Sequence, residues 1–241
     1  MAKGGSFLLE KAPGKAPSIL RERPTAKVAA VIPAHNEERR IGGVIDALKR
    51  SEAVDQLIVV SDGSTDRTYE IAKRDPFVQA FQLPHNRGKG GAMYAGAIQA
   101  QADWLLFLDA DLMGLSSSHI YRLLAPIRDG EADMAVGIFM GGRFLTDLSQ
   151  KIMPAITGQR VVSRDFFLSI PDIQHVRYGV ETAIGFHARR QGLRISRVEL
   201  SGVTHPLKEE KLGTLRGGAA RFRMYYEMGK YAVHAHRSYR K

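Results

Sequence analysis

The stretch WLLFLDAD, residues 104–111, places five apolar residues directly before two aspartates that one alanine separates. Such a run is typical of a strand buried inside a sheet. Two carboxylates at the end of a buried strand need a counter-charge, and a divalent cation on a diphosphate would supply one. Mg²⁺ and Mn²⁺ prefer hard oxygen ligands. The stretch therefore predicts a strand that ends in a metal–phosphate site at Asp109 and Asp111; an Asp-containing loop with a helix cap is the alternative.

The pattern of a strand followed by a polar loop occurs three more times upstream. Apolar runs at 28–32, 57–60 and 78–83 precede polar loops at 33–37, 61–66 and 86–89. The spacing predicts helices at 38–50, 65–74, 90–101, 116–127, 163–169 and 181–190, a fifth strand at 134–138 and an extended segment at 193–200. This alternation predicts an α/β three-layer sandwich with a mostly parallel sheet. Since ligands bind beyond the carboxyl ends of parallel strands, the polar loops should form one site.

The composition limits the classes of protein to consider. The chain has 241 residues, no cysteine and a formal net charge of +10. The lack of cysteine excludes a disulfide scaffold, a thiolate zinc site and a cysteine nucleophile, and fits a cytoplasmic protein. No run of 18 apolar residues occurs, so no membrane-spanning helix is expected.

The basic surplus lies at the two ends of the chain. Residues 1–27 contain six basic and two acidic side chains, residues 207–241 contain nine and three, and residues 28–206 contain 20 of each. We therefore expect a flexible basic arm (1–27), a catalytic domain (28–206) and a basic, aromatic C-terminal helix and tail (207–241). The tail could contact an anionic membrane surface or pack on the domain. A neutral central domain does not favour a nucleic-acid partner.

Two other nucleotide-binding patterns fail. The glycines of GKGGAM, residues 88–93, follow the third predicted strand instead of the first, so they do not match a dinucleotide fingerprint. No P-loop pattern occurs, which excludes the common NTPase class. A sugar-1-phosphate nucleotidyltransferase would need a glycine-rich basic loop after the first strand, where this chain has the acidic PAHNEE.

Four motifs together resemble the GT-A glycosyltransferases of family 2. They are VIPAHNEE (31–38), VVSDGSTD (59–66), NRGKGGAM (86–93) and FLDAD (107–111). The later segments TGQRVV, YGVET and VTHPLKEEK are similar to a subset that includes glucosyl-3-phosphoglycerate synthases and polyprenyl-phosphate sugar transferases. The resemblance implies a GT-A fold, a nucleotide-sugar donor and a Mg²⁺ or Mn²⁺ cofactor.

The resemblance also implies which residues bind the donor. Glu37 would bind a ribose hydroxyl, Asp62 the ring N–H of uracil or guanine, and Lys89 the diphosphate or ribose. Asp62 fits a turn residue equally well, and Glu37 fits ordinary helix N-terminal charge. The full set of residues expected at the nucleotide sugar is Pro33, Ala34, His35, Glu37, Ser61, Asp62, Lys89, Asp109 and Ala110.

The metal, catalytic and acceptor roles follow from the same resemblance. Asp111 would bind the metal together with His205, and imidazole is an acceptable manganese ligand. Glu181 would position the acceptor or act as its base. An acceptor phosphate would be held by the segment Gly158, Gln159 and Arg160. Each assignment has an alternative without a functional role. His205 could be a surface histidine or a hydrogen-bonded core histidine, Glu181 could be ordinary charge at a helix N-terminus, and Arg160 could be a solvated loop arginine.

The sequence therefore predicts a metal-dependent glycosyltransferase. Its donor would be a nucleoside diphosphate sugar, with UDP favoured over GDP, and its acceptor a hydroxyl or phosphate group on a phosphorylated small molecule or lipid. A catalytically idle nucleotide-sugar binder or a membrane-peripheral scaffold is the alternative. The stereochemical outcome and a homodimeric state are left open.

Overall fold

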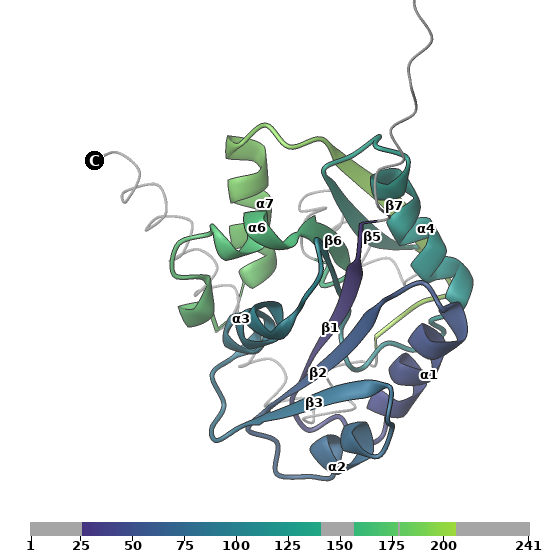
Figure 1. Cartoon of the computed structure of the whole chain (residues 1–241), viewed down its shortest axis with the longest axis vertical. Helices are drawn as coiled ribbons and strands as arrows, with labels where there is room; N and C mark the ends of the chain where they lie inside the picture. The colour runs from purple at the N-terminus through teal and green to yellow at the C-terminus, as the bar shows by residue number, and fades with distance from the viewer. Residues whose placement is uncertain (1–25, 141–156, 178, 206–241) are drawn as a thin grey trace, which may run out of the picture.

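A computed structural model describes residues 26–140, 157–177 and 179–205 of the chain. Its centre is a seven-stranded sheet in the order β3-β2-β1-β4-β6-β5-β7 (Figure 1). The strands are β1 (Val28–Ala34), β2 (Gln56–Asp62), β3 (Val78–Leu83), β4 (Trp104–Phe107), β5 (Met134–Met140), β6 (Arg160–Ser163) and β7 (Ile195–Ser201). All neighbouring pairs are parallel except those of β6, which is antiparallel to both β4 and β5. The predicted α/β architecture with a mostly parallel sheet is confirmed.

Helices cover both faces of this sheet, as the nearly continuous burial of the strands β1, β2 and β4 requires. One face carries α1 (Ile41–Ser51), α2 (Thr68–Lys73) and α4 (Ser117–Arg128). The other face carries α3 (Lys89–Gln99), α6 (Arg164–Leu168), the 3-10 helix η1 (Ile173–His175) and α7 (Val180–Arg190). Figure 1 shows these two layers on opposite sides of the sheet.

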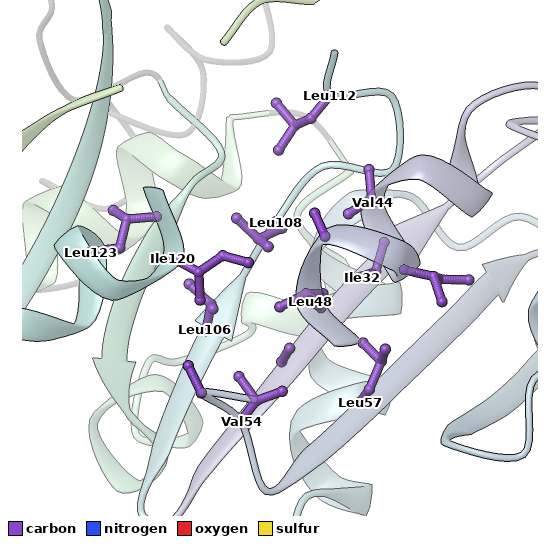
Figure 2. Close-up of a cluster of buried hydrophobic side chains, with 14 of the residues drawn as sticks. Ile32, Val44, Leu48, Val54, Leu57, Leu106, Leu108, Leu112, Ile120 and Leu123 are labelled. Carbon is purple, nitrogen blue, oxygen red and sulfur yellow. The ribbon is translucent and has the colours of Figure 1, made fainter. Parts of the chain in front are cut away.

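The first of the two cores shows why α1 forms where it does. Its apolar residues Ile41, Val44, Ile45 and Leu48 recur at helical spacing, and all four are buried. In Figure 2, Val44 and Leu48 lie against Ile32 of β1, close to Leu106 of β4. The burial of this stripe holds α1 in place, and the polar loop that precedes α1 stays at the sheet edge.

The predicted elements agree with the structure to within a few residues, with two corrections. The second helix was predicted to begin at residue 65, but α2 begins at Thr68 after the N-cap residue Arg67. No strand was predicted after 134–138 until the extended segment at 193–200, but the short strand β6 begins at Arg160. The reason is that β6 has only four residues and pairs with β4, more than 50 positions upstream, so no local pattern signals it.

The terminal segments lie almost wholly outside the described residues. The predicted arm is described only at its last two residues, where the Lys27 N–H donates to the Asp103 carboxylate. The predicted C-terminal helix and tail, residues 207–241, and the turn predicted at 141–143 are not among the described residues. In the part of the chain that is described, no helix has the length and apolar character that a membrane crossing requires.

Candidate active site

The loops after β1 and β2 are joined by hydrogen bonds from backbone N–H groups to side chains. The N–H of Asn36 donates to Ser64 Oγ, that of Glu37 to Thr68 Oγ1, and that of Glu38 to Asp66 Oδ2, at 2.8–3.1 Å. Asn36 adopts a positive φ of 55°, and its side-chain oxygen accepts the N–H of Thr65 at 2.9 Å. The polar residues of these two motifs therefore hold the two loops against each other at the carboxyl edge of the sheet.

Asp62 connects the β2 loop to the loop that precedes α3. Its two carboxylate oxygens accept the N–H groups of Arg87 and Gly88 at 2.6 and 2.8 Å. The side chain is buried, with 4% of the residue exposed. In the structure Asp62 thus fixes the loop that carries Lys89, and its contact with a nucleotide base stays a prediction.

The other residues expected at the nucleotide differ in how accessible they are. His35 is exposed, and its Nδ1 lies 2.8 Å from the backbone oxygen of Asp62. Pro33 and Glu37 are partly exposed, whereas Ala34, Ser61 and Ala110 are buried. All six lie on the loop edge that the sequence predicted, and their contacts with a donor stay predictions.

Asp109, Asp111 and His205 come together at this edge. One ligand atom from each lies within 4.8 Å of the other two. His205 Nδ1 is 2.8 Å from Asp111 Oδ1, and its Nε2 is 3.5 Å from Asp109 Oδ2. Two carboxylates and an imidazole at this spacing form a ligand set that suits Mn²⁺ or Mg²⁺.

A short backbone bridge explains how residues 94 positions apart meet. Met113 and Thr204 exchange N–H···O bonds of 2.9 and 3.0 Å, which places the segment after Asp111 beside the segment that carries His205. Gly114 lies so close to this second segment that a Cβ atom would meet the Gly202 oxygen at 2.2 Å. The sequence showed the glycines but gave no signal that they approach each other.

Lys89 forms an ion pair with two carboxylates at once. Its Nζ lies 2.5 Å from Asp109 Oδ1 and 2.5 Å from Glu181 Oε1. Burial alone would lower the pKa of Lys89, but the charges of Asp109 and Glu181 outweigh burial and raise that pKa above its ordinary value. In the structure Lys89 balances the charges of Asp109 and Glu181, and its expected contact with the diphosphate or ribose stays a prediction.

The same balance acts on the acidic and imidazole groups beside it. Burial raises the pKa of Asp109, but the positive charge of Lys89 prevails and lowers it. Burial lowers the pKa of His205, but its hydrogen bond with Asp111 and the negative charge of Asp109 raise it overall. The cluster therefore keeps Asp109 ionised and favours the protonated imidazole of His205 next to Asp111.

The segment 158–160, expected at the acceptor, instead packs against Asp109. The Gln159 side-chain amide donates to Asp109 Oδ2 at 2.9 Å, and Gln159 is fully buried. A Cβ atom on Gly158 would meet the two Asp109 carboxylate oxygens at 2.3 and 2.5 Å. The segment therefore lies at the site beside Asp109, a contact that the sequence did not predict because it depends on the unpredicted strand β6, and its role toward an acceptor stays a prediction.

Arg160 is not the solvated loop arginine that was the alternative reading. Only 1% of the residue is exposed, and its guanidinium donates to the backbone oxygens of Glu181 and Thr157. These contacts hold the first turn of α7 against β6, and the expected contact of Arg160 with an acceptor phosphate stays a prediction.

Glu181 lies in the first turn of α7, as predicted, and is largely buried. Its carboxylate shares Lys89 with Asp109, so α7 delivers a second acidic group to the same cation. The assembled edge thus presents two carboxylates and an imidazole for a metal, with a lysine and a further carboxylate beside them. Such a group can bind a metal-bound diphosphate and stabilise charge on its departure.

Comparison with known proteins agrees with this geometry. The sequence model of glycosyl transferase family 2 matches residues 29–191. A dolichyl-phosphate beta-glucosyltransferase of Trichomonas vaginalis is 30% identical over 54% of this chain and 44% of its own length. An uncharacterized protein of Methanocaldococcus jannaschii is 27% identical over 77% of this chain and 85% of its own. The chain spans less than half of the dolichyl-phosphate relative.

Solved structures give the same result. Glucosyl-3-phosphoglycerate synthase from Mycobacterium tuberculosis, in complex with Mn²⁺, UDP-glucose and phosphoglyceric acid, superposes with a TM-score of 0.65 at 25% identity. The match covers 85% of this chain and 80% of the synthase. Another structure of that synthase contains Mg²⁺ and UDP. On the family match, which extends over most of the described sheet and helices, the chain belongs to glycosyl transferase family 2.

Proposed function

We propose that this protein transfers a sugar from a UDP-sugar to a phosphorylated acceptor, with Mn²⁺ or Mg²⁺ held by Asp111 and His205. The observation that carries the proposal is the Asp109–Asp111–His205 cluster, whose ligand atoms lie within 4.8 Å of one another beside Lys89. A GDP-sugar is the second choice of donor, since Asp62 could accept the ring N–H of either uracil or guanine.

The metal-ligand atoms of Asp111 and His205 fit the proposed cation. Asp111 would offer an oxygen and His205 a nitrogen to the cation, a ligand pair that suits Mn²⁺ or Mg²⁺ bound to a diphosphate. Asp109 is already paired with Lys89 and Gln159, so it is better placed on the ribose side of the donor. When bound, the cation would offset the charge that develops on the departing diphosphate.

The chain's own residues would hold the acceptor and its proton. The Lys89 ammonium group pairs with Glu181 and Asp109 at once, which holds the Glu181 carboxylate beside the donor site. An ionised Glu181 can accept the proton of an acceptor hydroxyl. A phosphate acceptor would need no base, because it is already ionised at neutral pH, and Glu181 would then only orient Lys89.

The class of acceptor rests on the relatives. The Mycobacterium tuberculosis structure contains phosphoglyceric acid, and the Trichomonas vaginalis relative is named for dolichyl phosphate. Phosphoglyceric acid and dolichyl phosphate both carry a phosphate group, which supports a phosphorylated acceptor, either a small molecule or a lipid. The two kinds are separated by supplying phosphoglycerate or a short polyprenyl phosphate to the purified protein with UDP-glucose and Mn²⁺.

The decisive test is the Asp111→Asn variant. Release of UDP from UDP-glucose should fall more than about 100-fold, because one metal ligand loses its charge. The stabilisation that Mn²⁺ adds to the UDP-bound protein should fall as well, since ligands stabilise the state that they bind. Asp46→Asn, an exposed aspartate on α1, is the matched control and should behave as wild type.

The alternative of an idle nucleotide-sugar binder predicts a different result. Wild-type protein would then bind UDP with Mn²⁺ but release no UDP from the sugar, with or without an acceptor. Metal-dependent turnover that survives in Asp111→Asn would contradict the metal assignment. Failure of UDP, GDP and TDP sugars alike to raise the melting temperature would contradict the donor assignment.

A further inference from the structure

A cavity of ≈ 370 Å³ lies between α7 and the strands β5 and β7, on the face of the sheet that α3 and α6 also cover. Its volume falls within the range of small-molecule sites, about 300–1,000 Å³. Gly185 on α7 contributes no side chain to its wall. The other lining residues are three apolar and three basic ones: Met134, Val136, Ile195, Arg160, Arg189 and Arg197.

The register of the sheet directs two of the arginines toward the same space. Val136 on β5 pairs with Arg160 on β6 and with Arg197 on β7, so the three side chains leave the same face of the sheet. Neighbouring strands lie about 4.8 Å apart, so the two arginines flank Val136 with backbones about 10 Å apart. Arg189 comes from the opposite wall, four residues after Gly185 and therefore on the same side of α7.

Two of the three arginines at this cavity, Arg189 and Arg197, have no acidic partner among the described residues. Within residues 26–140, 157–177 and 179–205, neither the Arg189 nor the Arg197 side chain forms a hydrogen bond or an ion pair, and no acidic side chain is among the lining residues. Both are exposed, whereas Arg160 is 1% exposed at the inner end. Guanidinium groups that converge without a carboxylate attract an anion, and phosphate matches their planar donor geometry.

The sheet side of the cavity is apolar. Met134 and Val136 are 1% and 5% exposed, and Ile195 next to Met134 is partly buried. A ligand that filled the cavity would therefore place an apolar group on these three residues and an anionic group between Arg189 and Arg197. We propose that the cavity binds a phosphate monoester of a compact apolar alcohol.

This site is separate from the one proposed for transfer. The cavity is lined by the C-terminal half of α7 and by residues of β5, β6 and β7. Its lining includes none of Asp109, Asp111, Lys89 or His205. Arg160 lies between the two, because it lines the cavity and also donates to the Glu181 backbone oxygen. The proposal does not depend on the identity of the donor or on the metal.

The test is calorimetric titration of the full-length protein with hexyl phosphate, without metal or nucleotide. Hexyl phosphate should bind, inorganic phosphate should bind at least about tenfold more weakly for lack of the apolar contact, and hexanol should not bind measurably. The double variant Arg189→Gln with Arg197→Gln should weaken the binding of hexyl phosphate by at least about tenfold. Arg190→Gln, an adjacent arginine on α7 that does not line the cavity, is the matched control and should bind as wild type.

Each other outcome overturns the proposal. Binding of hexyl phosphate that is the same in the double variant would place the ligand elsewhere, for example at the proposed acceptor site. Equal binding of hexanol would show that the cavity does not select an anion. UDP release from UDP-glucose should stay at the wild-type level in the double variant, so loss of this binding and failure of the proposed transfer can be told apart.

Discussion

The two halves of the sheet edge contribute to the site in different ways. In the first half, up to β4, most motif side chains bind the backbone of a neighbouring loop: Ser64, Asp66 and Thr68 accept N–H groups of the β1 loop, and Asp62 accepts those of the α3 loop. In the second half, residues 157–205, side chains reach the reactive groups themselves. Gln159 contacts Asp109, Glu181 contacts Lys89, and His205 contacts Asp111.

The two halves therefore have different roles: the first half holds the loops of the site in place, and the second half supplies its charged contacts. The first half forms a rigid set of loops through hydrogen bonds that each involve residues close to the strand ends. The second half completes the electrostatics of Asp109 and Asp111 by contacts across 50 to 94 positions of sequence. Changes in the first half should therefore cost stability more than catalysis, and changes in the second half the reverse.

The largest effect should come from Lys89→Met, which breaks the ion pairs that join the two halves. Removal of one partner from a buried pair costs about 3–5 kcal/mol, and the 29% exposure of the Lys89 side chain reduces the expected cost to about 2–3 kcal/mol. Two unpaired carboxylates would also repel each other at the site. Urea unfolding and UDP release should both be impaired, the latter more than about 100-fold.

A second substitution shows whether the cost comes from charge. Addition of Glu181→Gln to Lys89→Met removes one of the two unpaired carboxylates and should restore part of the unfolding free energy, without restoring transfer. Wild-type stability in the single variant would mean that water, not Lys89, balances Asp109 and Glu181.

Gly158→Ala tests the second half alone. Its Cβ would meet the Asp109 carboxylate oxygens at 2.3 and 2.5 Å, so the carboxylate or the strand must shift. We expect UDP release to fall about 100-fold, because a displacement of about 1 Å at a reacting group can cost that much. The loss of unfolding free energy should be smaller in proportion, about 1–3 kcal/mol as for other overpacked sites.

Gly43→Ala is the matched control for that substitution. Gly43 lies in α1 with no atom within 4 Å of an added Cβ, so alanine should raise the unfolding free energy by about 0.5–1 kcal/mol. Its rate of UDP release should not change. If Gly158→Ala keeps full activity, the contact between segment 158–160 and Asp109 does not position the carboxylate for transfer.

The same division explains what the sequence could predict. WLLFLDAD identified β4 and its two aspartates because an apolar strand and its polar end are adjacent in sequence. Asp62 was placed at the correct edge, but its bonds to residues 87 and 88 were not predictable, since SDGS is equally consistent with a ligand contact and a turn. The contact of segment 158–160 with Asp109 was not predicted, because the antiparallel insertion of β6 between β4 and β5 leaves no periodic signal.

His205 and Glu181 were identified only through the resemblance to family 2. A lone histidine and a helix-start glutamate carry no local pattern that distinguishes a ligand from ordinary charge. The structure adds what the motifs lacked: the Met113–Thr204 bridge that brings His205 to Asp111, and the lysine that brings Glu181 to Asp109.

The smallest effect should come from Asp66→Asn, which weakens only the support in the first half. Asp66 accepts the N–H groups of Glu38 and Thr68 and the Thr68 hydroxyl, at 2.5–3.1 Å. Burial raises the pKa of Asp66, but these hydrogen bonds prevail and lower it below the ordinary carboxyl value. Asparagine keeps one acceptor oxygen, so we expect a loss of about 1 kcal/mol in unfolding free energy at pH 7 and less than about a fivefold change in UDP release.

The loss of unfolding free energy in Asp66→Asn should depend on pH, because it comes from the ionised form of Asp66. Because the folded pKa lies below the unfolded one, ionised Asp66 stabilises the protein above the unfolded carboxyl pKa of about 3.9, and this contribution disappears as the pH falls through the folded pKa. The difference between wild type and Asp66→Asn in urea unfolding should therefore shrink from pH 7 to pH 3. A difference that is constant over this range would show that the hydrogen bonds act without the charge, and a catalytic loss larger than that of Gly158→Ala would reverse the division of labour between the two halves of the edge.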